Sequence, residues 1–187
     1  MQRLMMICGV VLLSAFTLTG VGAVSVSASG HEFITSTTGK TKSKGTNVQR
    51  FKTGAGTIEC TAVTGTGEVK ETKMVGHKEV LTYSGCSGFG VNLKVTPAHF
   101  EFNANGFAKL EKQVVISSES LTCEVLIEPQ TLETVSYANE SGKVKATATV
   151  TKIHSIGTGG MCGSENTEGT YSGSILGELE GGTVEWK

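Results

Sequence analysis

Apolar and polar side chains alternate with a period of two along much of the chain, and this pattern constrains the fold more than any other feature. In the run from 144 to 150, every second residue is Val or Ala, and the residues between them are Lys or Thr. Similar runs lie at 91–95, 100–103 and 121–127. Because successive side chains of a strand point to opposite faces, each run predicts a strand with one buried face.

The composition agrees with an all-β chain. There are 25 Gly and only 2 Pro, and Thr and Val recur throughout the sequence. Branched β-carbons fit an extended backbone, and Gly marks turns. No segment after residue 28 has the apolar spacing of an amphipathic helix. We therefore expect about ten short antiparallel strands in a sandwich or a closed barrel, since both architectures protect the edges of a sheet.

Gly-containing segments are predicted to separate these strands. Asn105-Gly106 is the strongest hairpin signal, because both residues tolerate the positive φ that a tight hairpin needs. Four other segments are also interpreted as turns: 54–56, 64–67, 139–142 and 157–160. The segment 37–46 has no apolar side chain, and it is predicted to be a long mobile loop. After Val150 the apolar phase slips by one residue, which predicts a β-bulge.

Residues 1–28 are predicted to be a secretory signal peptide with an apolar signal helix. Arg3 supplies the positive charge, residues 4–18 are mostly apolar, and small residues precede two candidate cleavage sites, after Ala23 and after Ala28. We favour cleavage after Ala28, which also removes Cys8. A retained membrane anchor is the alternative, but the apolar run is short for a bilayer core, which needs about 20 apolar residues.

Cleavage after Ala28 leaves 159 residues, a length that suits one domain. We divide them into a polar N-terminal segment, 29–47, with a candidate first strand at 31–35, and a disulfide-stapled β domain, 48–187. Loss of Arg3 leaves 15 basic and 17 acidic side chains, for a net charge of −2. We therefore expect no nucleic-acid partner, because such a partner needs a basic stripe. We also expect no membrane span after cleavage.

Four cysteines remain in the mature chain: Cys60, Cys86, Cys123 and Cys162. An even number of cysteines in an exported chain predicts two disulfide bonds, and three pairings satisfy that number. We favour Cys60–Cys86 and Cys123–Cys162, because each pair then joins a strand cysteine to a Gly-rich loop nearby in the sequence. A zinc site is disfavoured, since the chain has none of the closely spaced cysteine pairs that structural zinc normally uses.

The chain offers little of the chemistry that catalysis or metal binding requires. All 17 acidic residues are Glu, which excludes Asp-based calcium loops and a pair of catalytic Asp residues. The histidines are not spaced as metal ligands, and we expect them to be solvated or incidental: His31, His77, His99 and His154. Glycoside hydrolysis needs only two carboxylates at a set distance. The candidate carboxylates, most of which alternate onto polar faces, are Glu124, Glu128, Glu133, Glu178, Glu180 and Glu185.

Several short motifs lie along most of the mature chain, within a resemblance that spans roughly Phe33 to Gly173. They are Phe51-x-Thr53-x-Ala55-Gly56-Thr57-Ile58-x-Cys60, Thr82-Tyr83-Ser84-Gly85-Cys86, Phe89-Gly90, Cys123-x-Val125-x-Ile127-x-Pro129-Gln130, Val135-x-Tyr137-x-Asn139 and Thr170-Tyr171-Ser172-Gly173. In these motifs the chain resembles an uncharacterised group of small, secreted, Thr- and Gly-rich proteins from soil actinobacteria. The resemblance implies export, a β-rich fold and disulfide bonds, and it implies no activity, ligand or catalytic residue.

We expect a secreted or cell-surface domain that is not an enzyme, needs no cofactor, and acts by binding an extracellular or cell-surface partner or as a structural element. Two alternatives stay open. One is a glycoside-type hydrolase that uses paired Glu residues, and the other is a barrel that carries a small apolar ligand. A carrier needs an enclosed apolar cavity, whereas a hydrolase needs two Glu in a cleft, one of them with a raised pKa.

Overall fold

The computed structural model describes residues 30–160 and 162–187. The predicted signal peptide, 1–28, and Cys8 lie outside the described residues. The described residues form sixteen strands and contain no helix, and every strand pair is antiparallel. The prediction of an all-β fold is confirmed. In this part of the chain, no helix is long and apolar enough to cross a membrane.

The strands belong to two sheets. The larger sheet contains β2 (Gly39–Gly45), β3 (Gln49–Thr53), β4 (Gly56–Val69), β6 (Gly76–Gly88), β7 (Val91–Val95), β8 (Ala98–Asn103), β9 (Phe107–Leu110), β10 (Val114–Ser118), β11 (Cys123–Ile127), β12 (Gln130–Glu133), β13 (Val135–Glu140), β14 (Lys143–Thr158) and β15 (Glu165–Leu179). The smaller sheet, which we call the end cap, contains β1 (Phe33–Thr35), β5 (Lys73–Met74) and β16 (Val184–Trp186).

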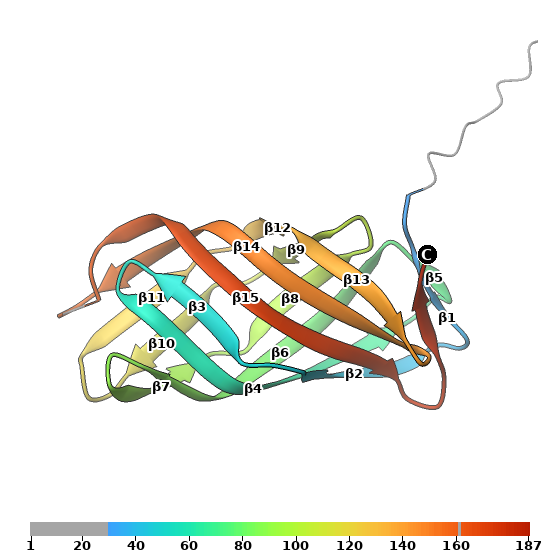
Figure 1. The fold of residues 1–187 in the computed structure, drawn as a ribbon, viewed down its shortest axis with the longest axis horizontal. Coiled ribbons are helices and arrows are strands. Elements are labelled where there is room, and N and C mark those ends of the chain that lie inside the picture. The colour runs from blue at the N-terminus through green and yellow to red at the C-terminus, as the bar shows by residue number, and fades with distance from the viewer. Residues whose placement is uncertain (1–29, 161) are drawn as a thin grey trace, which may run out of the picture.

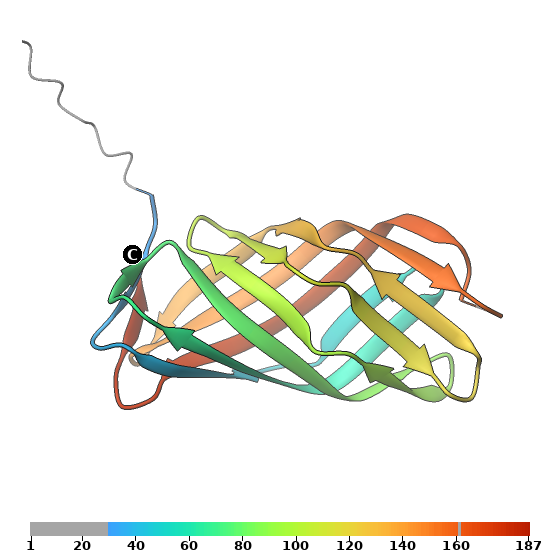
Figure 2. The ribbon, with the colours of Figure 1, turned by 180° about the vertical axis from the view of Figure 1, so that it is seen from behind.

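Hydrogen-bonded pairing in the larger sheet passes from strand to strand until it returns to its starting point. From β14 it continues through β15, β3, β4, β6, β7, β10 and β11, and β11 pairs again with β14. β2 also joins β15 to β4. The long strands run at a slant around the interior, and the end cap lies across one end (Figures 1 and 2).

Buried apolar side chains fill the interior in two clusters. The larger cluster contains both disulfide bonds and large aliphatic side chains such as Ile58 and Ile116. The smaller cluster lies under the end cap and includes Phe33, Tyr137 and Val144. Burial of a large apolar side chain contributes roughly 1.5–3 kcal/mol, so these clusters provide most of the driving force for folding.

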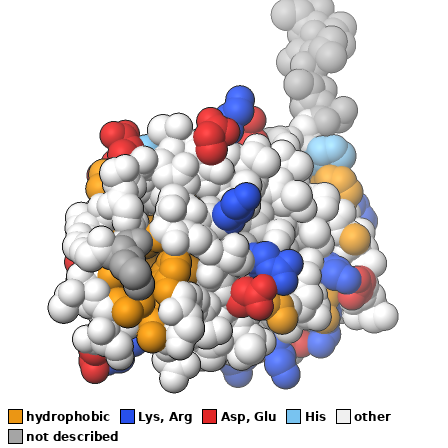
Figure 3. Space-filling model, turned by 60° about the vertical axis from the view of Figure 1, so that its left-hand side comes forward, with side chains coloured by type: hydrophobic (Ala, Val, Ile, Leu, Met, Phe, Trp, Pro, Cys, Tyr) orange, Lys and Arg blue, Asp and Glu red, His pale blue; other side chains and the backbone are white. Residues whose placement is uncertain are grey.

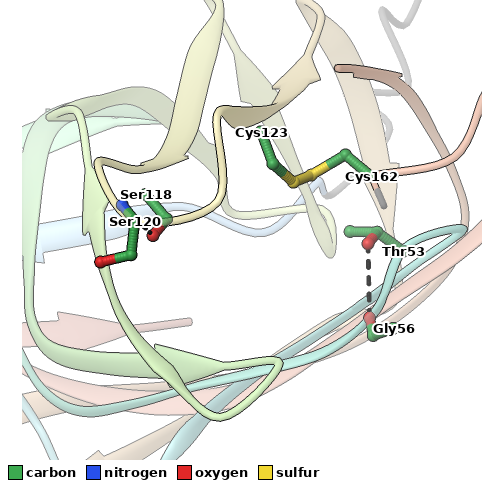
Figure 4. The surroundings of a disulfide bond; sticks show 6 residues. All are labelled: Thr53, Gly56, Ser118, Ser120, Cys123 and Cys162. Carbon is green, nitrogen blue, oxygen red and sulfur yellow. Dashed lines mark hydrogen bonds between the residues drawn. A yellow bond between two sulfur atoms is a disulfide. The ribbon is translucent and has the colours of Figure 1, made fainter. Parts of the chain in front are cut away.

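Two disulfide bonds join Cys60 to Cys86 and Cys123 to Cys162, the pairing that the sequence favours. Cys60 on β4 directly opposes Cys86 on β6, so Cys86 lies in a strand rather than in the expected loop. The second bond links the start of β11 to the connection between β14 and β15 (Figure 4). Disulfide bonds persist in oxidising environments, and the two pairs are therefore compatible with an extracellular location.

Several local predictions are confirmed. Residues 104–106 form the turn between β8 and β9, and residues 141–142 form the turn between β13 and β14. The register of β14 against β15 shifts after Val150, where the bulge was predicted. The strands are more numerous than ten, and β4, β6, β14 and β15 are long rather than short, with 13 to 16 residues each.

Two local predictions are wrong for the same reason. The segment 64–67, interpreted as a turn, lies inside β4, and most of the predicted loop at 37–46 is strand β2. Both segments are polar or Gly-rich, yet each pairs with a strand on both sides. Ladder hydrogen bonds from distant parts of the chain therefore decide the conformation that local sequence left open.

Charged side chains of opposite sign lie close together on the outer surface. Arg50 pairs with Glu59, and Lys143 pairs with Glu178. Figure 3 shows acidic and basic side chains near one another, with a group of hydrophobic side chains at the end of the molecule that faces the viewer. Exposed ion pairs contribute only about 0–1 kcal/mol each, so they do not determine the fold.

Candidate functional site

An internal cavity of about 70 Å³ lies between the larger sheet and the end cap. Its wall is mostly apolar and includes Phe33 and Val184 from the cap and Phe102 and Ile175 from the larger sheet. A second cavity of about 30 Å³ lies further along the interior and shares Phe102 and Ile175 with the first. The interior is thus less completely filled at the capped end than elsewhere.

One wall of the cavity carries polar side chains from β6 and β2. His77 and Glu79 both line the cavity from β6. From β2, the Ser43 hydroxyl donates a hydrogen bond to Glu79 Oε2 over 3.1 Å, and Thr41 Oγ1 lies 3.1 Å from His77 Nε2. Four polar residues therefore form two hydrogen-bonded pairs on the inner surface of the sheet.

These pairs form across β4, because β4 lies between β2 and β6. In the register, Gly65 lies between Ser43 and Leu81, and Gly67 lies between Thr41 and Glu79. A Cβ atom on Gly65 would overlap the Ser43 hydroxyl, and one on Gly67 would lie 2.7 Å from Thr41 Oγ1. Glycine inside a strand commonly marks such a close approach. The two glycines create the space in which the polar wall forms.

The acid and the base on this wall have strongly shifted pKa values. Glu79 is only 5% exposed, and its burial raises the pKa of the carboxyl to about 7, while the hydrogen bond from Ser43 opposes the shift. Burial lowers the pKa of His77 to about 4, so that the imidazole is neutral at neutral pH. The described residues that line the cavity include no Lys or Arg, so Glu79 has no cationic partner there.

Three further polar atoms around the cavity have no hydrogen-bond partner among the described residues. They are Thr35 Oγ1 on β1, His77 Nδ1 on β6 and Tyr137 Oη on β13. Thr35 is 5% exposed and Tyr137 is 9% exposed, and burial raises the pKa of the Tyr137 hydroxyl above its ordinary value. A buried polar atom without a partner costs about 1–3 kcal/mol. A bound molecule with polar atoms of its own would relieve that cost.

Specific side-chain contacts of Trp186 help to hold the end cap against the larger sheet. Trp186, the only tryptophan, donates its indole N–H to the Ala104 carbonyl over 2.8 Å and stacks on His31 at 4.4 Å between ring centroids. The amide side chain of Asn139 exchanges two hydrogen bonds with the backbone of Trp186. Phe33 of the cap is also buried in the smaller apolar cluster, so polar and apolar contacts together hold the cap over the cavity.

The glutamates that the sequence offered as catalytic candidates are not brought together in a cleft. All six are exposed or partly exposed: Glu124, Glu128, Glu133, Glu178, Glu180 and Glu185. Glu178 is the one among them that also lines the cavity, and its carboxylate pairs with Lys143. Glu79, which is buried, was not among the candidates.

The histidines are only partly as expected. His31 is exposed, and His154 lies near the surface, with Nε2 2.8 Å from Glu165 and Nδ1 3.6 Å from Glu128. His77 instead lines the cavity, where its side chain is only partly exposed, and of the two expectations for it, solvated or incidental, the first is not met. Within the described ranges, no group of three or more His, Cys or Glu side chains is arranged to hold a metal ion.

The sequence contains a signal for this site, although hydrophobicity alone conceals it. On β6, every second residue from 77 to 83 faces the interior: His77, Glu79, Leu81 and Tyr83. Because Val80 is also apolar, hydrophobicity alone does not show which of the two alternating rows is the inner one.

Comparisons with protein families, with curated proteins and with solved structures find no match for this chain. The geometry of the cavity is therefore the basis for the function proposed below.

We expect Gly65→Ala to lower the free energy of unfolding by about 1–3 kcal/mol, because the added methyl group overlaps Ser43 and crowds Leu81. Gly177→Ala is the matched control, since a Cβ there would meet only the Val144 carbonyl, at 3.6 Å. The control should be neutral or slightly stabilising. Denaturant unfolding measures both variants, and equal stabilities would contradict a close approach across β4.

Glu79 should also make stability depend on pH. The unfolded chain releases this proton near 4.5 and the folded chain near 7. The contribution of Glu79 to the free energy of unfolding is therefore fully present below pH 4.5 and is lost as the pH rises through 7. His77 acts in the opposite direction, because its contribution is present above 6.5 and is lost as the pH falls through 4.

The variant Glu79→Gln isolates the first effect, because His77 is unchanged in it. Between pH 4.5 and about 8, the free energy of unfolding of the unmodified protein should fall relative to that of the variant by up to about 3 kcal/mol. Denaturant titrations of both proteins at several pH values measure this difference. A difference that stays constant over the whole range would mean that Glu79 titrates normally.

Proposed function

We propose that this protein is a non-catalytic binding protein of the cell exterior that holds a small molecule inside the sheet, beneath the end cap. The observation that carries the proposal is the internal cavity, which has apolar walls and three polar atoms without a hydrogen-bond partner among the described residues. Small-molecule sites in proteins are typically apolar and contain a few polar groups that orient the ligand. The cavity combines both features.

The size of the cavity limits the ligand. A cavity of about 70 Å³ is roughly half as large as the engineered cavity of about 150 Å³ that binds benzene in another protein. A ligand that fits without rearrangement therefore has only a few non-hydrogen atoms. A longer ligand would extend past Phe102 and Ile175, which line this cavity and the next one.

We also infer that the larger sheet is a closed barrel rather than a sandwich. The return of strand pairing from β11 to β14 supports this architecture. A barrel of about eight strands has an interior just wide enough for side chains or for one small ligand. Export is supported by the predicted signal peptide at 1–28 and by two disulfide bonds, which suit an oxidising compartment.

A hydrolase with paired Glu residues receives less support from this arrangement. Glu79 has the raised pKa that a general acid needs. The other carboxylate at the cavity, Glu178, is paired with Lys143. A retaining or inverting mechanism requires a second free carboxylate that faces the first across the substrate.

Native mass spectrometry of the secreted protein, without reductant, tests the proposal. We expect the mass of Ser29–Lys187 less four hydrogens, together with an additional mass that is lost on denaturation. Ala146→Leu, which fills the cavity, should lose the additional mass. Ala62→Leu, the same change at an exposed position of β4, should keep it.

The proposal would be overturned by two results together. One is a native mass without any additional component. The other is an unfolding temperature that does not change in the presence of small amines, alcohols or carboxylic acids. A full-length mass would instead overturn the inference of export and cleavage.

A further inference from the structure

We infer that the ligand is a small organic cation, a primary amine with a short apolar chain, whose ammonium group binds the carboxylate of Glu79 beneath the end cap. This inference rests on the proposed function, because it names the ligand class of the same cavity. It is carried by the charges, the hydrogen-bonding atoms and the aromatic rings that line the cavity.

The first support is an acid without a partner. Glu79 is buried and accepts a hydrogen bond from the Ser43 hydroxyl. An ionised carboxylate is strongly disfavoured in a protein interior unless it is paired with a cation. A ligand with a positive charge supplies that partner, and it would favour the ionised form of Glu79.

None of the described residues at the cavity supplies this positive charge. From its own strand and from β2, Glu79 is faced by His77, which is neutral at neutral pH, and by Thr41 and Ser43. The groups on other elements are Thr35, Tyr137 and Glu178, and the carboxylate of Glu178 is paired with Lys143. The described lining residues thus include one acid without a counter-ion and no cationic side chain.

The second support is the set of unpartnered atoms. An ammonium group has three N–H donors and no acceptor. Thr35 Oγ1 and Tyr137 Oη each have lone pairs that accept a hydrogen bond, and neither has a partner among the described residues. His77 Nδ1 is also an acceptor in the tautomer that carries its proton on Nε2. In that tautomer the Nε2–H group donates a hydrogen bond to Thr41 Oγ1. The residues that line the cavity therefore supply three acceptor atoms in addition to the carboxylate of Glu79.

The third support comes from the apolar part of the wall. Phe33 and Tyr137 lie edge to face, with ring centroids 5.1 Å apart, and Phe102 lies further along the cavity. Aromatic faces attract cations, and aliphatic walls accept a hydrocarbon chain. The amine group would thus lie near Glu79, and the chain would point toward Phe102 and Ile175.

Three ligands with the same chain length test the inference: n-butylamine, 1-butanol and butyrate. Calorimetry with the intact protein at pH about 8 should show that butylamine binds at least tenfold more tightly than butanol, and that butyrate does not bind. At pH about 5.5, where Glu79 is protonated, the affinity for the amine should fall at least tenfold, because the ammonium group loses its charged partner.

Glu79→Gln should abolish the preference for the amine, whereas Glu68→Gln, at an exposed position of β4, should retain it. The comparison among ligands uses the unmodified protein, so it holds even if Glu79→Gln does not fold. Butanol or butyrate binding as tightly as the amine would overturn this inference and leave the proposed function standing. Binding of none of the three, in a protein that carries no other bound molecule, would overturn both.

Discussion

Ser43 and Glu79 form a hydrogen bond across an intervening strand, and the arrangement of the capped half of the molecule depends on that bond. It requires β2 and β6 to present polar side chains inward at adjacent inward-facing positions of the register, because Glu79 is level with Thr41 and Ser43 is level with Leu81. It also requires β4 to have no side chain between them, a condition that Gly65 and Gly67 satisfy. A buried carboxyl tolerates few alternatives, so the register of three strands is linked to the placement of one acid.

The two ends of the interior differ in chemistry. Around the disulfide bonds, the core consists of closely packed apolar side chains such as Ile58 and Ile116. Under the end cap, strands of both sheets carry hydroxyls, an imidazole and a carboxyl around a cavity. A rigid, cross-linked end can hold the strands in place while the other end keeps polar groups that are not fully satisfied. That combination is costly for a purely structural protein and useful for a binding protein.

Sequence reasoning could predict the features that depend on local patterns. The strand at 144–150, the turn at Asn105-Gly106 and the bulge after Val150 all follow from spacing along the chain. It could not predict the role of Gly65, because a Gly-x-Gly segment is the same signal for a turn and for a close approach of strands. The candidate site was missed for a related reason, since Glu79 is buried by partners far away in the sequence.

The most direct test of this account is the titration of Glu79 itself, followed by ¹³C NMR of the side-chain carboxyl groups. The resonance of Glu79 is identified by its absence in Glu79→Gln. The account predicts that this resonance moves with a midpoint near pH 7, because the carboxyl is buried without a cation. A midpoint near 4.5, the ordinary value for Glu, would mean that the carboxyl is solvated, and it would contradict the polar wall described here.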